Sequence, residues 1–276
     1  MFALDRDGAG PGYWPSPWPV ECGGNRRQKA SPGRLDAASG IAAVTSRRTS
    51  RWDVMVVNRN PGEWFVGGTM AAFTGPPPHG WVERFDPETL EPLAHSPALP
   101  CGDHVWCGAI LAHANGSIYS VNGSHLHRLH PDDLHVEAER VLVDCSHNGL
   151  LALADGTLVT KDLRLEGQGL TTVSRFDPET LEPVGAPVTL PEGSMGRIAA
   201  DVDAAGTERI YVPGTEHLLR LRVDGADLVL DDWRPRYRRA GDPNGLSWDA
   251  CLSGDAVWAM DNGDIESVRH IHQTFP

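Results

Sequence analysis

Lysine is nearly absent from this 276-residue chain: among its 24 lysine and arginine side chains, only Lys29 and Lys161 are lysines. No stretch is long and apolar enough to predict a membrane-spanning helix. The first residues also lack the basic start and apolar core of a secretory signal. The five cysteines include no Cys-x-x-Cys pair, a pattern typical of a reduced protein. We therefore expect a cytoplasmic protein.

Excess positive charge is lacking too, because the formal net charge is −13. A surface of this sign argues against nucleic acid and anionic membranes as partners. The sequence also lacks a nucleophile elbow, a phosphate-binding loop and a dinucleotide fingerprint. The enzyme classes that depend on those motifs are therefore not predicted.

What the sequence does contain is a motif that recurs. Residues 83–91 read ERFDPETLE and residues 174–182 read SRFDPETLE, and weaker copies stand at 127–135 (HRLHPDDLH) and 221–229 (LRVDGADLV). The arginines of successive copies are separated by 44, 47 and 47 residues, and one more step of 47 reaches Arg269. A period of this length is typical of β-propellers and other repeat arrays.

Each repeat shows four short strand signals separated by turn residues, which predicts an all-β fold, a β-propeller of four-stranded blades. The propeller domain is expected at residues 39–276. Residues 1–38, with their glycine, proline and basic clusters, are interpreted as a disordered or atypical segment. The five repeats are expected near residues 51–100, 101–144, 145–193, 194–241 and 242–276.

The fifth repeat leaves two interpretations of the ring open. Its third strand signal lies at residues 264–269, and no Asp-Pro turn follows Arg269. A strand at residues 40–46 would supply the outermost strand and close a five-bladed ring. The alternative, which we favour, is truncation of a six- or seven-bladed parent.

The recurring motif is expected to be architectural. Aspartate caps the turn and proline fixes φ at its second position, and the following leucine should pack between neighbouring blades. The column of arginines is expected to form ion pairs between blades, with partners such as Glu83 or Asp86 and their equivalents.

A ligand site is expected at the channel mouth, where loops entering the inner strands meet loops leaving the second strands. As substrate-binding residues for a small molecule we select the polar groups of these loops, His104, His147, Lys161, Arg197 and Asn262. A lysine at this rim would bind a carboxylate or phosphate. The alternative is an exposed lysine at a strand end, paired with Asp162.

Two stretches carry a family resemblance. Residues 242–249 read DPNGLSWD and are followed by AVWAMDN at 256–262, and residues 147–162 read HNGLLALADGTLVTKD. They resemble the gluconolactonase–regucalcin family of calcium-dependent lactonases, in which Asn-Gly-Leu precedes an inner strand and the loop asparagine is a metal ligand. The resemblance implies metal ligands at Asn148 and Asn244. The family's acidic ligands from other blades have no match here.

The chemistry of these loops agrees with that resemblance. A hard divalent cation such as calcium takes oxygen ligands, polarises a lactone or ester carbonyl and lowers the pKa of bound water, and Asp162 or Asp261 would act as general base. The sequence therefore predicts a metal-dependent lactonase or esterase with calcium as cofactor. The alternative is a non-catalytic propeller that binds a ligand or a protein partner, or that self-associates, with the asparagines serving turns.

Histidines gather between residues 125 and 130, at His125, His127 and His130. His125 and His127 share one face of a strand, but zinc sites need three or four converging ligands, so we interpret these histidines as structural. Cys101 and Cys107, on either side of His104, are interpreted as buried thiols.

Overall fold

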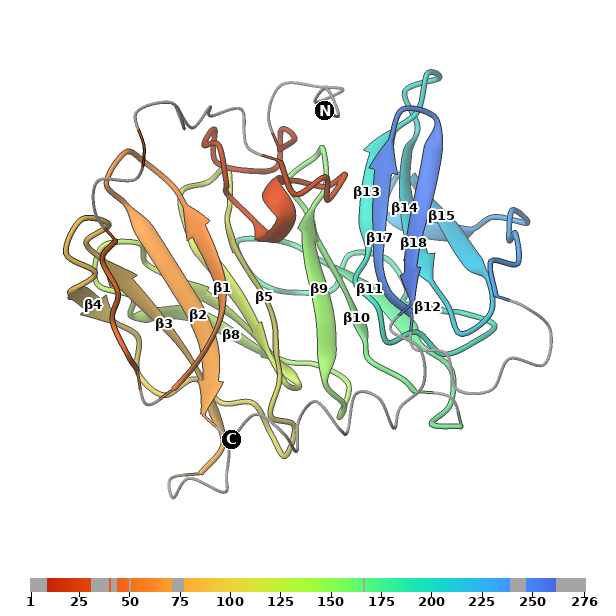
Figure 1. Ribbon diagram of the computed structural model, residues 1–276. Helices are drawn as coiled ribbons and strands as arrows, with labels where there is room; N and C mark the ends of the chain where they lie inside the picture. Colours follow the sequence, from red (N-terminus) through yellow and green to blue (C-terminus); the bar gives the residue numbers. More distant parts are fainter. Residues whose placement is uncertain are drawn as a thin grey trace.

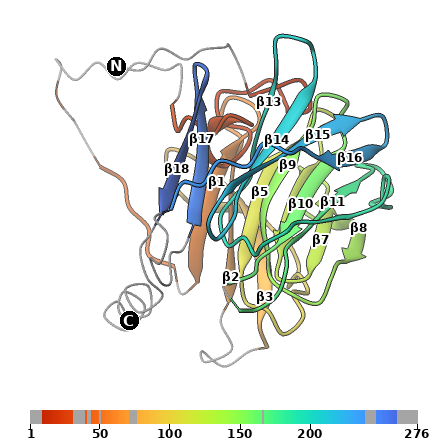
Figure 2. The same cartoon turned by 90° about the vertical axis from the view of Figure 1, so that its right-hand side faces the viewer.

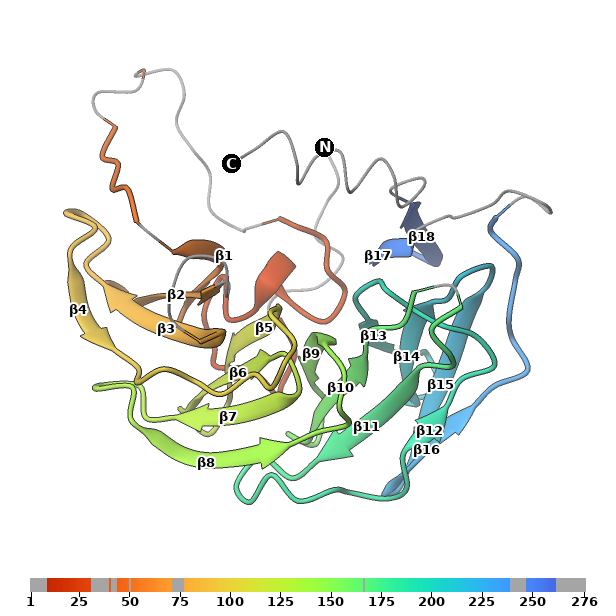
Figure 3. The ribbon, with the colours of Figure 1, turned by 90° about the horizontal axis from the view of Figure 1, so that it is seen from below.

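Short strands pair with their chain neighbours to form antiparallel sheets, most of them with four strands. The computed structural model describes residues 9–30, 40, 44–49, 51–70, 77–165, 167–238 and 247–261. The sheets follow one another around a common centre, so the chain is a β-propeller (Figures 1 and 3). No helix among the described residues has the length and apolar character needed to cross a membrane.

The strands run outward from the centre in chain order within each blade. Blade 1 comprises β1 (Trp52–Asn58), β2 (Trp64–Met70), β3 (His79–Phe85) and β4 (Pro92–His95). Blade 2 comprises β5 (Cys107–Ala112), β6 (Ile118–Asn122), β7 (His125–Leu129) and β8 (Val136–Val141). Blade 3 comprises β9 (His147–Ala152), β10 (Leu158–Asp162), β11 (Thr172–Phe176) and β12 (Val188–Thr189). Blade 4 comprises β13 (Ala199–Val202), β14 (Glu208–Pro213), β15 (Leu218–Asp224) and β16 (Asp227–Leu230). Of blade 5, the described residues show β17 (Ser247–Ser253) and β18 (Ala256–Asp261).

The predicted all-β propeller is confirmed, and the four-strand pattern appears in blades 1 to 4. The predicted third strand of blade 5, at residues 264–269, lies outside the described residues, as does Arg269. Most of the predicted strand at 40–46 also lies outside them. The choice between a closed five-bladed ring and a truncated parent depends on these segments.

Apolar side chains fill the space between neighbouring blades. One buried cluster joins blades 1, 2 and 3 through residues such as Phe65, Ile110 and Leu158, and a second joins blades 3 and 4. The inner strands approach closely at Gly108, where an added Cβ would lie 2.1 Å from the carbonyl oxygen of His147. Burial of apolar surface therefore holds the blades side by side.

The Asp-Pro motif forms the turn between the third and fourth strands, as predicted. In its first copy the Asp86 carboxylate accepts hydrogen bonds from the backbone N–H groups of Glu88 (2.8 Å) and Thr89 (2.9 Å). The N–H of Leu90 donates to the Asp86 carbonyl oxygen at 2.7 Å. The copy at 177–182 repeats this pattern through Asp177. The turn geometry is thus set locally by the capping aspartate.

The leucine of each of these turns adopts the left-handed backbone conformation. Its φ is 61° at Leu90, 61° at Leu134 and 58° at Leu181, a region that costs a residue with a Cβ about 1–2 kcal/mol. Leu134 and Leu181 are fully buried, which confirms their packing role. Burial of a leucine side chain stabilises by about 1.5–3 kcal/mol, enough to offset the backbone strain.

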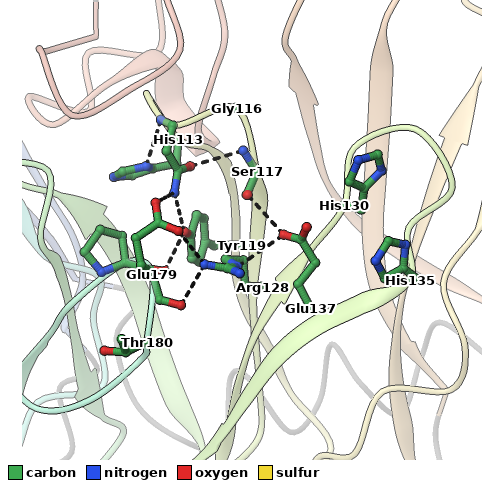
Figure 4. Close-up of polar contacts among 12 residues, drawn as sticks. His113, Gly116, Ser117, Tyr119, Arg128, His130, His135, Glu137, Glu179 and Thr180 are labelled. Carbon is green, nitrogen blue, oxygen red and sulfur yellow. Dashed lines mark hydrogen bonds and ion pairs between the residues drawn. The ribbon is translucent and has the colours of Figure 1, made fainter.

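The arginine column also connects blades, although its partners differ from those expected. Three of its arginines reach the turn between strands three and four of the next blade, as Arg128 does in Figure 4. Arg222 instead pairs with Asp224, the equivalent of Asp86, and with Asp231 in its own blade. The contacts are Arg84 to Asp132 (3.7 Å), Arg128 to Glu179 (2.6 Å) and Arg175 to the carbonyl oxygen of Gly225 (2.7 Å). These three contacts therefore hold the third strand of one blade beside the outer turn of the next.

Replacing Leu181 tests the balance between burial and strain. We expect Leu181→Ala to lower the free energy of unfolding by about 2–5 kcal/mol. Leu181→Gly should lower it by no more than that, since glycine adopts a φ of 58° without a steric penalty. Urea denaturation measures both values. The control Leu93→Ala, at a side chain 56% exposed, should change stability by less than about 0.5 kcal/mol. A glycine variant clearly weaker than the alanine variant would contradict the strain argument.

Candidate functional site

Seven of the nine predicted site residues are described, whereas Asn244 and Asn262 lie outside the described residues. The seven do not form a single cluster. Asn148, Lys161 and Arg197 converge on the centre of the ring, and the other four pair with local partners.

Asn148 and Lys161 hold a loop of the next blade. The Lys161 ammonium group donates a hydrogen bond to the carbonyl oxygen of Ser194 at 2.8 Å, and the Asn148 amide donates to that of Met195 at 2.7 Å. Both side chains are fully buried, and their strands β9 and β10 lie side by side in blade 3. Their visible role is to join blade 3 to the loop that precedes β13.

Burial sets the protonation behaviour of Lys161. Desolvation lowers the pKa of its ammonium group to about 7, against the opposing attraction of Asp162. Sequence reasoning placed this lysine at a rim where it would meet a ligand. In the structure the ammonium group instead faces backbone carbonyl oxygens of the protein.

Arg197 lies among aromatic rings at the centre. Its guanidinium group is 5.3 Å from the ring centroid of Trp248, and its Nε forms an ion pair with Glu21 at 2.8 Å. Trp106 packs edge-on against Trp248, with centroids 6.3 Å apart, and its Nε1 donates to the Asn148 side-chain oxygen at 3.2 Å. The centre of the ring is therefore packed, and its charges are paired.

The two predicted histidines have separate partners. His104 Nε2 lies 2.9 Å from the carboxylate of Asp144 in the neighbouring loop. His147 is buried, and its Nδ1 donates to the carbonyl oxygen of Cys145 at 3.0 Å. Burial lowers the pKa of His147 to about 4, so its imidazole is neutral at physiological pH.

The two predicted general bases are engaged as well. Asp162 is buried, and its carboxylate accepts hydrogen bonds from the backbone N–H of Thr172 (2.7 Å) and from Arg164 Nε (3.0 Å). Asp261, at the end of β18, forms an ion pair with Arg238 at 3.1 Å. None of these contacts brings either carboxylate to Asn148.

The described donors do not fit a calcium ion. Calcium takes six to eight oxygen ligands, but the Asn148 oxygen already accepts a hydrogen bond from Trp106. Asp162 is held by Arg164. The Lys161 ammonium group bonds to the carbonyl oxygen of Ser194, next to the Met195 carbonyl that accepts from Asn148, so a cation already lies close to the proposed ligand. The calcium site remains a prediction, since Asn244 lies outside the described residues.

An N-terminal segment crosses the centre and was not foreseen. This N-terminal segment (residues 9–30) includes the 3-10 turn η1 (Glu21–Gly23) and lies at the end of the propeller where first and second strands are joined (Figures 1 and 2). The expectation of disorder for residues 1–38 is wrong for residues 9–30, where Tyr13, Val20 and Cys22 are buried. At Gly12 an added Cβ would lie 2.3 Å from the carbonyl oxygen of Leu153, so only glycine fits this contact.

The N-terminal segment bonds to the inner strand of every blade. Carbonyl oxygens of residues 18, 19, 25 and 26 accept hydrogen bonds from backbone N–H groups of four inner strands, and the Asn25 amide donates to the fifth. The strand partners are Asn58 in β1 (2.8 Å), Ala112 in β5 (2.7 Å), Ala152 in β9 (2.9 Å), Ala200 in β13 (2.8 Å) and Leu252 in β17 (2.9 Å).

A buried ion pair fixes the end of this segment. Arg27 Nε lies 2.6 Å from the Asp249 carboxylate, with the two side chains only 3% and 6% exposed. The same guanidinium contacts Glu21 at 3.2 Å, which in turn pairs with Arg197. Asp249, Arg27, Glu21 and Arg197 therefore form one chain of ion pairs between the segment and the channel wall. Each buried charge has a partner of opposite sign, which offsets the cost of removing it from water.

The N-terminal segment also builds a hollow of about 940 Å³. Its walls are mostly apolar, with Tyr13, Trp14 and several prolines on one side and the alanines of three inner-strand ends on the other. Polar groups include Asn25 and Glu208. Because inner strands run from the His104 loop toward Ala114, the hollow lies at the opposite end of the channel from the predicted site.

Sequence reasoning missed this hollow because residues 1–38 were set aside. A signal was present in Tyr13, Trp14 and Trp18, since disordered segments are poor in aromatic residues. Arg26, Arg27 and Lys29 form a basic cluster in the sequence, with no predicted role. Two of them instead pair with Asp249.

Comparison with known proteins adds a fold-level likeness. No protein-family model and no curated protein matches the chain. A protein of unknown function from Bacteroides caccae is similar at 12% identity and TM-score 0.45, over 68% of this chain and 60% of that one. A chain of the mitotic checkpoint complex is similar at 12% identity and TM-score 0.40, over 82% and 76%. The present chain thus spans 60% of the length of the Bacteroides protein. The class, a β-propeller with an internal N-terminal segment, follows from the sheets themselves.

The Arg27–Asp249 pair gives a stability prediction. Arg27→Met leaves a buried carboxylate with less compensation, so we expect the free energy of unfolding to fall by about 3–5 kcal/mol. Lys29→Met removes a second partner of the same carboxylate, but this lysine is 51% exposed, so the loss should stay below about 1 kcal/mol. Guanidinium denaturation provides both values. Equal losses in the two variants would show that the buried pair does not anchor the segment.

Lys161 predicts a pH dependence. Its pKa is near 7 in the folded protein and about 10.4 when unfolded, so between these values the unfolded state binds more protons. Stability from this group is therefore lowest below pH 7 and rises toward pH 10. Accordingly, the free energy of unfolding of the wild type minus that of Lys161→Met should increase between pH 7 and pH 9.5. A difference that is flat or falls with pH would rule out a lysine of depressed pKa.

Proposed function

We propose that this chain is a ligand-binding β-propeller whose recognition site is the hollow beside the N-terminal segment. The observation that carries the proposal is the position of this hollow, at the end of the channel and between an ordered segment and three blades. Ligand sites are typically concave, mostly apolar and supplied with a few placed polar groups. Its volume of about 940 Å³ is within the range of small-molecule pockets.

The lining favours an organic ligand with an apolar ring system and hydrogen-bond donors. Tyr13 and Trp14 offer aromatic surface. The Glu208 carboxylate, whose pKa burial raises, accepts from the N–H of Ala154 at 3.0 Å and has acceptor capacity left. A hydrogen-bond donor on the ligand would use the remaining acceptor capacity of the Glu208 carboxylate. The expected partner is still a small molecule. Its site is now proposed at the opposite end of the channel from the site predicted around the His104 loop.

Catalysis by a metal-dependent lactonase is not the activity we propose. The groups expected to carry it, Asn148 and Asp162, have protein partners in the described structure. These partners account for the residues without a substrate. Metal-dependent hydrolysis is therefore the alternative function that the ligand screen can detect.

The experiment is a screen of a fragment library by ligand-observed NMR against the whole chain. Ala154 lines the hollow and is exposed, so Ala154→Trp should fill the space without disturbing the core. We expect fragments that bind the wild type to lose at least about tenfold in affinity, since a filled pocket excludes them sterically.

A matched control is available in the next blade. Ala204 occupies the same position of its hairpin, is exposed and does not line the hollow, so Ala204→Trp should leave binding unchanged. Fragments insensitive to Ala154→Trp would refute this site. Hydrolysis of lactones or aryl esters that needs calcium and stops with a chelator would establish the hydrolase instead.

A further inference from the structure

The second copy of the recurring turn differs from the first and third in its side chains but not in its backbone. Where the first and third copies read DPETLE, the copy at 130–135 reads HPDDLH. Its Leu134 N–H still donates to the carbonyl oxygen of residue 130 at 2.9 Å, and its φ of 61° matches those of Leu90 and Leu181. The turn scaffold is therefore shared, and its side chains differ.

The substitution of His130 for the usual aspartate weakens the turn's own capping. Asp177 accepts backbone N–H groups at 2.9 and 2.8 Å, whereas His130 Nδ1 accepts from Asp132 at 3.4 Å. The change therefore gives the turn no better local hydrogen bond. This raises the question of what the imidazole does there.

The replaced positions bring three ligand groups together. The imidazole rings of His130 and His135 are stacked at the end of the β7–β8 hairpin, 5.1 Å apart at an angle of 15° (Figure 4). The Asp133 carboxylate lies 2.7 Å from His135 Nδ1 and 3.4 Å from His130 Nδ1. The three ligand atoms are all within 4.8 Å of one another, so small side-chain rotations would bring them to the ligand distances near 2.0–2.2 Å that zinc requires.

The turn is held in place from two sides. Leu134 anchors it in the core, where its side chain is fully buried. From blade 1, Arg84 contacts the Asp132 carboxylate at 3.7 Å, so Asp132 is occupied and Asp133 remains beside the histidines. Fixed backbone on a hairpin reduces the ordering cost of binding.

We propose that His130, Asp133 and His135 bind a divalent transition metal of the zinc class. Two imidazole nitrogens and one carboxylate oxygen form the donor set that zinc, copper and nickel accept, and that calcium does not favour. All three side chains are more than a third exposed. Water or a group from a bound partner would therefore complete the coordination.

The test is calorimetric titration of the whole chain with zinc chloride. We expect one zinc ion bound per chain at this turn. The turn variant His130→Asp, Asp132→Glu, Asp133→Thr, His135→Glu gives the chain the sequence of its own third copy, which forms the same turn. It keeps an acidic partner for Arg84 and should fold normally, yet lose binding. His135→Gln alone should weaken zinc by at least about tenfold.

A control at the neighbouring histidine pair locates the ion. His125 and His127 also stack, with centroids 6.1 Å apart on β7, so zinc held there would be lost in His125→Gln. We expect that variant to bind zinc like the wild type. Equal binding by the wild type and the turn variant, loss of binding in His125→Gln, or no zinc binding by the wild type would each overturn the proposal.

Discussion

Hydrogen bonds between the N-terminal segment and the five described inner strands, four of them main-chain to main-chain and the fifth from the Asn25 side chain, are the constraint on which the centre of this propeller depends. Blades of a propeller are hydrogen-bonded sheets that meet one another through side chains, and such packing is non-directional. A segment that bonds to every inner strand adds direction, because each bond fixes one strand relative to the same short piece of chain. The Arg27–Asp249 ion pair then locks that piece at blade 5.

Features governed by local sequence were predicted well. The predicted four strands per repeat are present in blades 1 to 4, and the Asp-Pro turn lies between the third and fourth strands as predicted. Strand alternation, turn capping and the repeat period are all decided within a few residues. The arginine column was predicted to link blades, and Arg84, Arg128 and Arg175 do so, whereas Arg222 pairs within its own blade.

Partners distant in sequence were not predictable from it. Lys161 was placed at a rim, but its ammonium group is buried against Ser194 of the next blade. Asn25 bonds to Ala152, 127 positions away, and Arg27 pairs with Asp249, 222 positions away. Residues 9–30 are rich in glycine and proline, a composition that is typical of a disordered tail. Only the assembled ring supplies the unpaired backbone groups and the buried carboxylate that order this segment.

The repeat also supplies a baseline against which function can be sought. The first three copies of the turn share the same backbone, including a leucine in the left-handed region. Stacking therefore restrains the leucine and the turn path in these copies but leaves the outward side chains free to vary. The HPDDLH copy keeps the buried Leu134 but has His130, Asp133 and His135 where the first and third copies have aspartate, threonine and glutamate. These three side chains are of types that can bind a metal ion. A side chain that gives its turn a weaker cap than Asp86 and Asp177 give theirs does not serve the stability of that turn. We therefore assign the change of side chains to the metal site proposed above.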